Sequence, residues 1–266
     1  MSNILAKDGF IYIASVHKFY YNMAVHSCET LKDFYPDAHV TLFTHEKFLD
    51  GKEKIFDNVV TDIPIHTRAK MWGMAHSPYE RTVYIDADTE VWSEDVKIIH
   101  QELDDCDMFF TRTPIYSAGN VKWIYVDKAM TKRLYWQGGM CGFVKNKLTQ
   151  DFVTTWYEEY LKQQSEPWPY PDYNDAQKQW DMFTLWKITN HPEFDRFKDL
   201  KIKEVNVKYN FCCNYLQEEL RGHEPCIVQY SRDAAKASEI YRKRFYNDEK
   251  TYFSKQETNC CPPKYN

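Results

Sequence analysis

The chain has 266 residues, of which 43% are hydrophobic and 27% charged, and its formal net charge is −5. This balance excludes a disordered chain, and the acidic charge argues against a domain whose whole surface binds nucleic acid. The length favours one large α/β domain with a sizeable core. Glycine is scarce, with eight residues, yet Gly138, Gly139 and Gly142 fall within five positions.

The sequence shows no sign of export or membrane insertion. Its first residues lack the basic region and apolar core of a secretory signal. The longest uncharged apolar stretch near them, residues 9–17, is about half as long as a membrane span requires. None of the eight cysteines forms a C-x-x-C pair, which argues against a structural zinc site. We expect a cytoplasmic protein with mostly free thiols and leave its oligomeric state open.

Strand-like and helix-like patterns alternate through the first half of the chain. The spacing of apolar residues predicts helices over 18–35 and 67–76, and strands over 10–15, 39–44, 58–61, 81–86, 107–111 and 142–144. This order favours right-handed crossovers and a Rossmann-like α/β domain with a mostly parallel central sheet flanked by helices. We expect that domain over residues 1–236, and a helical or irregular extension over 237–266 packed on it.

The strand predicted over 81–86 leads directly into two acids, Asp86 and Asp88, separated by the small Ala87. In an extended backbone, residues two positions apart point to the same side. Two carboxylates at the carboxyl end of a parallel strand suit a divalent cation that also binds phosphate oxygens. The alternative is a strand that ends in a solvated acidic turn.

Residues 84–91, YIDADTEV, resemble the D-x-D segment of GT-A fold glycosyltransferases, especially the glycogenin-like and galactosyltransferase-like retaining enzymes. Further segments match in the same order between residues 10 and 236. The resemblance implies a GT-A fold, a UDP-sugar donor, Mn²⁺ or Mg²⁺ as cofactor, and retention of the anomeric configuration. It also implies that Asp86 and Asp88 hold the metal.

The same resemblance implies a set of residues that bind the donor nucleotide. They come from the ends of the first two strands, the predicted helix before the acids, and the acid pair itself: Ala14, Ser15, Thr44, Arg68, Lys70 and Asp86. Beyond the last matched strand, Arg232 and Lys236 are candidates for contacts with the diphosphate. The alternative for these two is that they are exposed surface cations.

The glycine cluster resembles the family's small-residue turn beneath the sugar and the acceptor, and this makes Gln137, Gly138 and Gly139 candidate catalytic-site residues. Glycine has no Cβ and permits positive φ, so a ligand can approach the backbone closely. A tight turn packed on Trp136 explains the same residues.

Asp181 resembles the family's acidic residue at the start of a helix that faces the acceptor. Such a residue is either an N-cap or dipole partner, or a catalytic group that accepts a hydroxyl proton or stabilises a cationic transition state. Asp175 is a weaker candidate for the same role. Asn210 resembles a residue that caps a turn near the site.

The segment 224–232, EPCIVQYSR, resembles the family's late strand but departs from its pattern. There the family has a histidine as the third protein ligand of the metal, and this chain has Gln229. The amide oxygen of glutamine can bind Mn²⁺ or Mg²⁺, but it is a poorer ligand than imidazole. His223 lies six residues upstream and does not match the ligand position.

The leading hypothesis is a metal-dependent glycosyltransferase that acts on a hydroxyl acceptor. The acceptor is a glycan, a protein or a small molecule, and a modified nucleobase is not excluded. One alternative, supported by Gln229, is a non-catalytic nucleotide-sugar-binding protein on a degenerate GT-A fold. The other is a sugar nucleotidyltransferase, although such enzymes usually carry a Gly-rich loop after the first strand and residues 15–21 contain no glycine.

Overall fold

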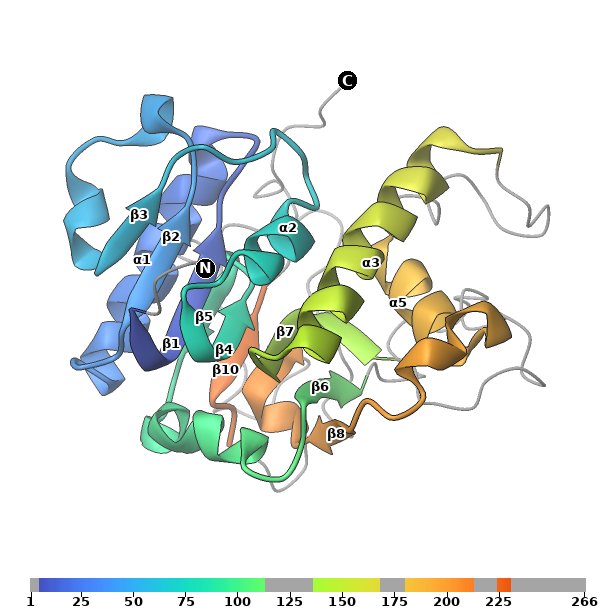
Figure 1. Ribbon diagram of the computed structural model, residues 1–266. Helices are drawn as coiled ribbons and strands as arrows, with labels where there is room; N and C mark the ends of the chain where they lie inside the picture. The colour runs from blue at the N-terminus through green and yellow to red at the C-terminus, as the bar shows by residue number, and fades with distance from the viewer. Residues whose placement is uncertain (1–4, 113–135, 168–179, 213–223, 231–266) are drawn as a thin grey trace, which may run out of the picture.

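A computed structural model describes residues 5–112, 136–167, 180–212 and 224–230 (Figure 1). Its centre is a seven-stranded sheet in the order β3-β2-β1-β4-β7-β6-β8. Every neighbouring pair is parallel except the two that involve β7, which is antiparallel to both β4 and β6. A smaller sheet in the order β5-β10-β9 lies beside the end of β4. The predicted α/β class with a mostly parallel sheet is therefore confirmed.

The strands and helices follow one another along the chain with short connections in the first half. The strands are β1 (Ala6–Ile13), β2 (Val40–Phe43), β3 (Asn58–Val60), β4 (Tyr79–Ile85), β5 (Thr89–Val91), β6 (Met108–Arg112), β7 (Trp136–Val144), β8 (Ile202–Val205), β9 (Phe211–Cys212) and β10 (Ile227–Gln229). The α-helices are α1 (Lys18–Phe34), α2 (Lys70–Ala75), α3 (Lys147–Ser165) and α5 (Asp181–Asn190). Short 3₁₀ segments are η1 (Glu46–Phe48), η2 (Lys52–Ile55), η3 (Glu94–Leu103), η5 (Pro192–Phe197) and η6 (Val207–Asn210).

Two apolar cores form, one on each face of the central sheet. Alternate residues of β1 separate between them, because Phe10 and Tyr12 pack with α1 while Ile11 packs with α2 and α3. Figure 1 shows the same division, with α1 on one face of the sheet and α2 and α3 on the other. The largest fully buried side chains are aromatic, among them Trp156 and Phe109. Much of the aromatic content is thus used in the two cores.

The predicted elements are largely present, with two differences. The helix predicted over 67–76 begins only at Lys70, because the preceding residues form a turn in which the Arg68 amide donates to Nδ1 of His66. The glycine cluster, predicted as a turn that enters a strand, lies within the strand β7. The described thiols of Cys28, Cys106, Cys141 and Cys226 are all free, as expected.

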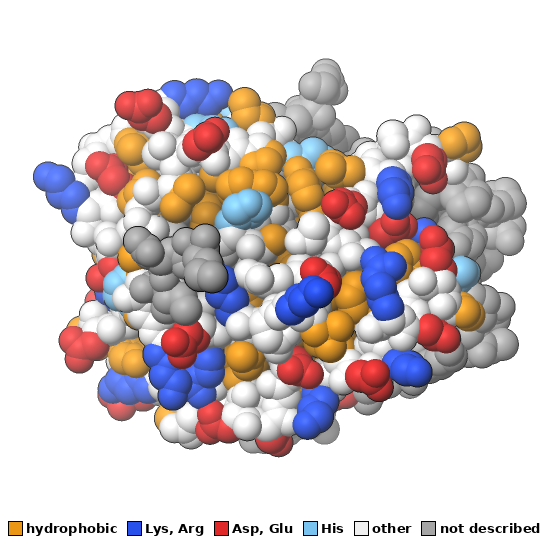
Figure 2. Space-filling view, viewed as in Figure 1, with side chains coloured by type: hydrophobic (Ala, Val, Ile, Leu, Met, Phe, Trp, Pro, Cys, Tyr) orange, Lys and Arg blue, Asp and Glu red, His pale blue; other side chains and the backbone are white. Residues whose placement is uncertain are grey.

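Some sequence predictions concern residues outside the described part of the chain. These include the boundary at residue 236, the C-terminal extension, and the side chains of Asp175, His223, Arg232 and Lys236. Among the described helices, none is long and apolar enough to span a membrane. On the face drawn in Figure 2, acidic and basic side chains are interspersed, and neither sign covers a large area.

Candidate active site

A pocket of about 470 Å³ opens where β1 and β4 end and where β7 begins. Because β7 runs against its neighbours, its first residues reach the same edge of the sheet as the last residues of β1 and β4. The pocket lies at the carboxyl ends of the parallel strands, where ligands bind in open α/β sheets. Most of the predicted site residues line it: Ser15, Arg68, Lys70, Asp86, Asp88, Gln137, Gly138, Gly139, Asp181 and Gln229.

The acid pair lies in the bend between β4 and β5 rather than in continuous strand. The Asp86 amide donates to the carbonyl of Gly139 at 2.8 Å, which ties this bend to β7. The hydroxyl of Tyr84 donates to the Asp86 carboxylate. Burial, together with the negative charge of Asp86, raises the pKa of Asp88 to about 7. Among the described residues, Asp88 therefore makes no ion pair, although the carboxylate of Asp86 lies next to it.

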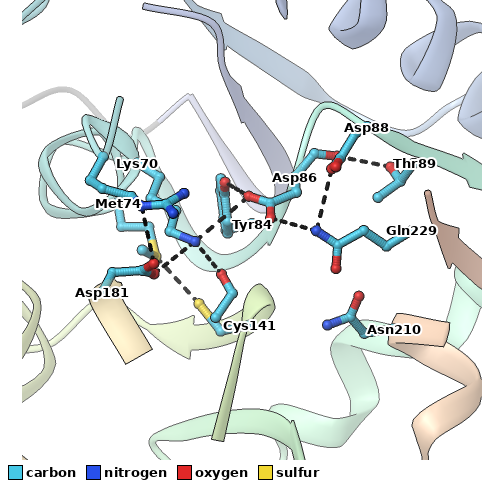
Figure 3. A network of polar contacts seen from close by, with 12 residues as sticks. Lys70, Met74, Tyr84, Asp86, Asp88, Thr89, Cys141, Asp181, Asn210 and Gln229 are labelled. Carbon is cyan, nitrogen blue, oxygen red and sulfur yellow. Dashed lines mark hydrogen bonds and ion pairs between the residues drawn. The ribbon is translucent and has the colours of Figure 1, made fainter. Parts of the chain in front are cut away.

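Gln229 reaches both acids from β10. This strand pairs with β5 so that Gln229 lies opposite Thr89, the residue that follows Asp88. The amide nitrogen of Gln229 donates to Oδ2 of Asp86 at 2.8 Å and to Oδ1 of Asp88 at 3.3 Å (Figure 3). Its amide oxygen is buried and has no hydrogen-bond partner among the described residues.

A second charged cluster occupies another wall of the pocket. Asp181, the first residue of α5, is 4% exposed, and its carboxylate lies 2.8 Å from Nζ of Lys70 and 3.2 Å from Nε of Arg68. Burial alone would raise the pKa of Asp181, but these two cations outweigh it and the pKa lies below its usual value. Asp181 is therefore ionised at neutral pH and already neutralised by its neighbours.

Lys70 links the two clusters (Figure 3). Besides Asp181, its ammonium group contacts the carbonyl oxygen of Gly138 at 2.7 Å and lies 3.8 Å from Oδ1 of Asp86. Burial lowers the pKa of Lys70, but Asp181 and Asp86 more than compensate and the net shift is upward. Lys70 thus remains charged although only 6% of it is exposed.

The glycines of β7 leave room for these side chains. Between β6 and β7 the pairing shifts from Phe110–Cys141 to Thr111–Gln137, so Gly138 and Gly139 lie in a β-bulge. A Cβ on Gly138 would lie 2.8 Å from Oδ2 of Asp181, and one on Gly139 would lie 2.5 Å from Oε1 of Gln229. Neither glycine has a positive φ. The two glycines therefore lie in a bulged strand rather than in a turn, and the close approach of side chains explains why neither position has room for a Cβ.

Comparison with known proteins identifies the architecture. No protein-family model matches the sequence, and no curated protein sequence matches it. Among solved structures, the galactosyltransferase LgtC in complex with donor and acceptor sugar analogues matches with a TM-score of 0.53 at 12% identity, over 94% of this chain and 98% of that chain. The glycosyltransferase GlyE of Streptococcus pneumoniae TIGR4 matches with a TM-score of 0.55 at 12% identity, over 84% of this chain and 54% of that chain. The chain has the GT-A fold. The predicted resemblance is confirmed at the level of the fold.

Not every predicted nucleotide contact reaches the pocket of this GT-A fold. Ser15 lines it, where its hydroxyl donates to the Pro64 carbonyl at 2.6 Å. Ala14 and Thr44 are fully buried and do not line the pocket, and the Thr44 hydroxyl donates to the Ala14 carbonyl at 2.9 Å. Gly142 packs against the ring of Phe109, away from the pocket. The ends of the strands were predicted correctly. The direction in which each side chain points was not.

Several pocket residues were missed by sequence reasoning: Ile13, Val16, Tyr20, Met23, His66, Thr67, Tyr84, Ala87 and Met182. Tyr84 precedes Asp86 by two positions on β4, so strand alternation could have placed both on one side. Tyr20 and Met23 lie in the first turns of α1, where a helical pattern gives no indication that the helix end faces a ligand. No sequence signal identifies these two.

The donor atoms around the acid pair suit a hard divalent cation. Within the described ranges, no group of three or more His, Cys, Asp and Glu side chains is placed to bind a metal. The available set is instead two carboxylates and the unpartnered amide oxygen of Gln229. An all-oxygen set of this kind is typical of Mg²⁺ and Mn²⁺ sites. The residues present therefore fit the metal that the resemblance implies.

Proposed function

We propose that the protein is a metal-assisted glycosyltransferase that moves a sugar from a nucleoside diphosphate donor, a UDP-sugar, to a hydroxyl group. The observation that carries this proposal is one pocket at the carboxyl ends of the strands that brings together an acid pair and a buried cation cluster. The GT-A fold supports it. Retention of the anomeric configuration is part of the proposal by resemblance to the retaining enzymes.

The donor's diphosphate would lie beside the acid pair. Asp86 and Asp88 would hold the divalent cation, with the amide oxygen of Gln229 as a third ligand. A cation bound there would neutralise charge that develops on the diphosphate as the sugar leaves. Lys70 lies between Asp86 and Asp181 and supplies a fixed positive charge next to the same leaving group.

The nucleoside would occupy the part of the pocket formed by the end of β1 and the start of α1. Ile13, Val16, Tyr20 and Met23 give this end an apolar and aromatic lining. A flat base can pack against such side chains, while the polar groups of the opposite wall remain available for the sugar. The acceptor, whether glycan, protein, small molecule or modified nucleobase, would enter from the side of Gln137 and Asp181.

Asp181 is better suited to electrostatic stabilisation than to proton transfer. A general base works best when its pKa lies near the working pH, and the pKa of Asp181 is depressed by Lys70 and Arg68. The carboxylate fixes these two cations in place beside the pocket, where their positive charge would stabilise the departing diphosphate. Proton transfer is therefore the less favoured of the two catalytic roles expected for Asp181.

The proposal is tested with Asp88→Ala, assayed with Mn²⁺ against a panel of nucleotide sugars for hydrolysis or transfer. We expect one donor to be consumed by the unmodified protein and the rate to fall about a thousandfold in the variant, since metal-assisted charge neutralisation contributes several kcal/mol. Asp37→Ala, at an exposed position after α1, is the matched control and should keep the full rate. An equal rate in Asp88→Ala would overturn the proposal.

A second candidate is a nucleotide-sugar-binding protein without transfer activity. It is favoured by the contact of the Gln229 amide nitrogen with both acids, which satisfies them without a cation. UDP binding in calorimetry that is indifferent to Mn²⁺, together with no consumption of any donor, would support this candidate. A sugar nucleotidyltransferase stays a weaker sequence-based alternative.

A further inference from the structure

Two buried amide oxygens beside the acid pair lack partners. Among the described residues, Oε1 of Gln229 and Oδ1 of Asn210 make no hydrogen bond, and the two residues are 7% and 0% exposed. The two side-chain amides point toward one another in Figure 3. A buried polar atom without a hydrogen bond is costly, and two acceptors that face each other cannot satisfy one another.

The orientation of Gln229 follows from the chemistry of its neighbours. Ionised carboxylates only accept hydrogen bonds, so once both are ionised Asp86 and Asp88 require a donor or a cation between them. The NH₂ group of Gln229 supplies that donor, at 2.8 and 3.3 Å. This leaves the amide oxygen on the opposite side, directed toward the oxygen of Asn210.

A cation at the acid pair would reverse this preference. Its positive charge would repel the NH₂ group of Gln229 and attract the amide oxygen. A half-turn about the last side-chain bond, which exchanges the two atoms, would therefore be favoured. After that turn, Nε2 of Gln229 would point toward Oδ1 of Asn210 and donate to it, and both oxygens that lack a partner among the described residues would then have one. Gly139 provides the space, because a Cβ there would lie 2.5 Å from Oε1 and 3.0 Å from Nε2.

The side chain of Asn210 is already oriented for this contact. Its own NH₂ group donates to the hydroxyl of Thr111 at 3.3 Å, which directs its oxygen away from Thr111. Asn210 is the last residue of η6 and directly precedes β9, which pairs with β10 in parallel, so the backbone holds Asn210 next to the strand that carries Gln229. The acceptor for the turned amide therefore exists before any cation binds.

We propose that Gln229 is a turning ligand and that Asn210 is the latch that holds it in the cation-binding orientation. Without a cation, the amide nitrogen bridges Asp86 and Asp88; with a cation, the amide oxygen binds the cation and the nitrogen donates to Asn210. This inference rests on the proposed metal-assisted function. Asn210 is thus a positioning residue that sets cation affinity without contacting the cation.

The test is a double-mutant cycle on Mn²⁺ binding, measured from the electron paramagnetic resonance signal of free Mn²⁺ with no donor present. We expect Asn210→Leu to weaken Mn²⁺ binding about fivefold, the value of one hydrogen bond. In a Gln229→Met background, where no amide can turn, Asn210→Leu should have no further effect. Asn190→Leu, at another buried asparagine at the end of α5, is the matched control and should leave Mn²⁺ binding unchanged.

The possible outcomes distinguish a failure of the proposed Asn210–Gln229 contact from a failure of the proposed metal-assisted function. Mn²⁺ binding with an Asn210→Leu effect that is equal in both backgrounds would overturn the latch and leave the metal-assisted proposal intact. No Mn²⁺ binding by the unmodified protein, even with UDP, would overturn both. A coupled effect that disappears with Gln229→Met supports the latch.

A measurement on the unmodified sequence guards against variants that fold poorly. The NH₂ protons of Gln229 are identified in NMR spectra by their absence in Gln229→Met. On addition of diamagnetic Mg²⁺ they should gain nuclear Overhauser contacts to the amide protons of Asn210. Bound Mg²⁺ with an unchanged pattern of contacts would overturn the proposal.

Discussion

The pocket holds aspartates in two opposite electrostatic surroundings: Asp181 lies beside cations, and the acid pair Asp86 and Asp88 lies beside a neutral amide. Asp181 is buried between two cations, and its pKa is lowered. Asp88 lies beside another carboxylate, is contacted by a neutral amide, and has its pKa raised to about 7. Among the described residues, the charge of Asp181 is thus balanced by cations and that of the acid pair is not, and the acid pair is where we propose that a cation binds. Lys70, in contact with both clusters, is the residue through which the comparison is best tested.

The largest expected effect is a loss of stability when a cation is removed from Asp181. Lys70→Met leaves the buried Asp181 with Arg68 alone and removes the donor to the Gly138 carbonyl. Removing one partner of a buried ion pair typically lowers the free energy of unfolding by about 3 to 5 kcal/mol. Chemical denaturation at pH 7 measures it.

The control for this variant is Lys18→Met. Lys18 pairs with Asp50 at the same 2.8 Å separation, but both side chains are about one-third exposed. Its loss should therefore be much smaller, because exposed pairs contribute little to stability. Similar losses in the two variants would contradict the idea that Asp181 depends on Lys70 for its buried charge.

The contribution of the acid pair Asp86 and Asp88 to stability should change with pH in the opposite sense from that of an ordinary ion pair. With a chelator present, the folded state keeps a proton on Asp88 up to about pH 7, while the unfolded state loses it near pH 4. The free energy of unfolding should therefore decrease as pH rises from 5 to 8, by about 1 to 3 kcal/mol. Asp88→Asn should remove most of this decrease, as followed by denaturation at both pH values. A decrease of the same size in the variant would assign it to other groups.

The smallest expected effects come from alanine substitutions at the two glycines of β7, one beside Asp181 and one beside Gln229. Gly138→Ala would crowd Asp181, and Gly139→Ala would crowd Gln229. Each should cost about 1 to 2 kcal/mol of stability by overpacking. Only Gly139→Ala should also weaken Mn²⁺ binding, because the amide beside the acid pair is displaced. If both variants reduced Mn²⁺ binding equally, the two clusters would not be separable.

The sequence was sufficient to predict a mostly parallel sheet with several of its strands, and ten of the residues that line the pocket, for identifiable reasons. The strand before Asp86 is strongly apolar, so its end, and hence the acid pair, could be located with confidence from periodicity alone. Gln229 was matched because its strand follows the order of the family segments. Both rest on local patterns, which a sequence displays directly.

The interactions between distant segments could not be read in the same way. Nothing local in the sequence pairs Lys70 with Asp181, since they start two different helices that meet only in the folded chain. The side-chain contacts that restrict Gly138 and Gly139 could not be predicted for the same reason. Their constraint comes from side chains of α5 and β10, while a sequence suggests only their own backbone freedom.

The charge balance of the pocket has a consequence for the order in which ligands bind. Among the described residues of the pocket, when all are ionised, the three carboxylates Asp86, Asp88 and Asp181 exceed the two cations Arg68 and Lys70 by one negative charge. A nucleoside diphosphate that arrives alone meets like charge, whereas a divalent cation is attracted. Steady-state kinetics should then show ordered addition, with the cation entering first or together with the donor, and the departing diphosphate should leave before the cation is released.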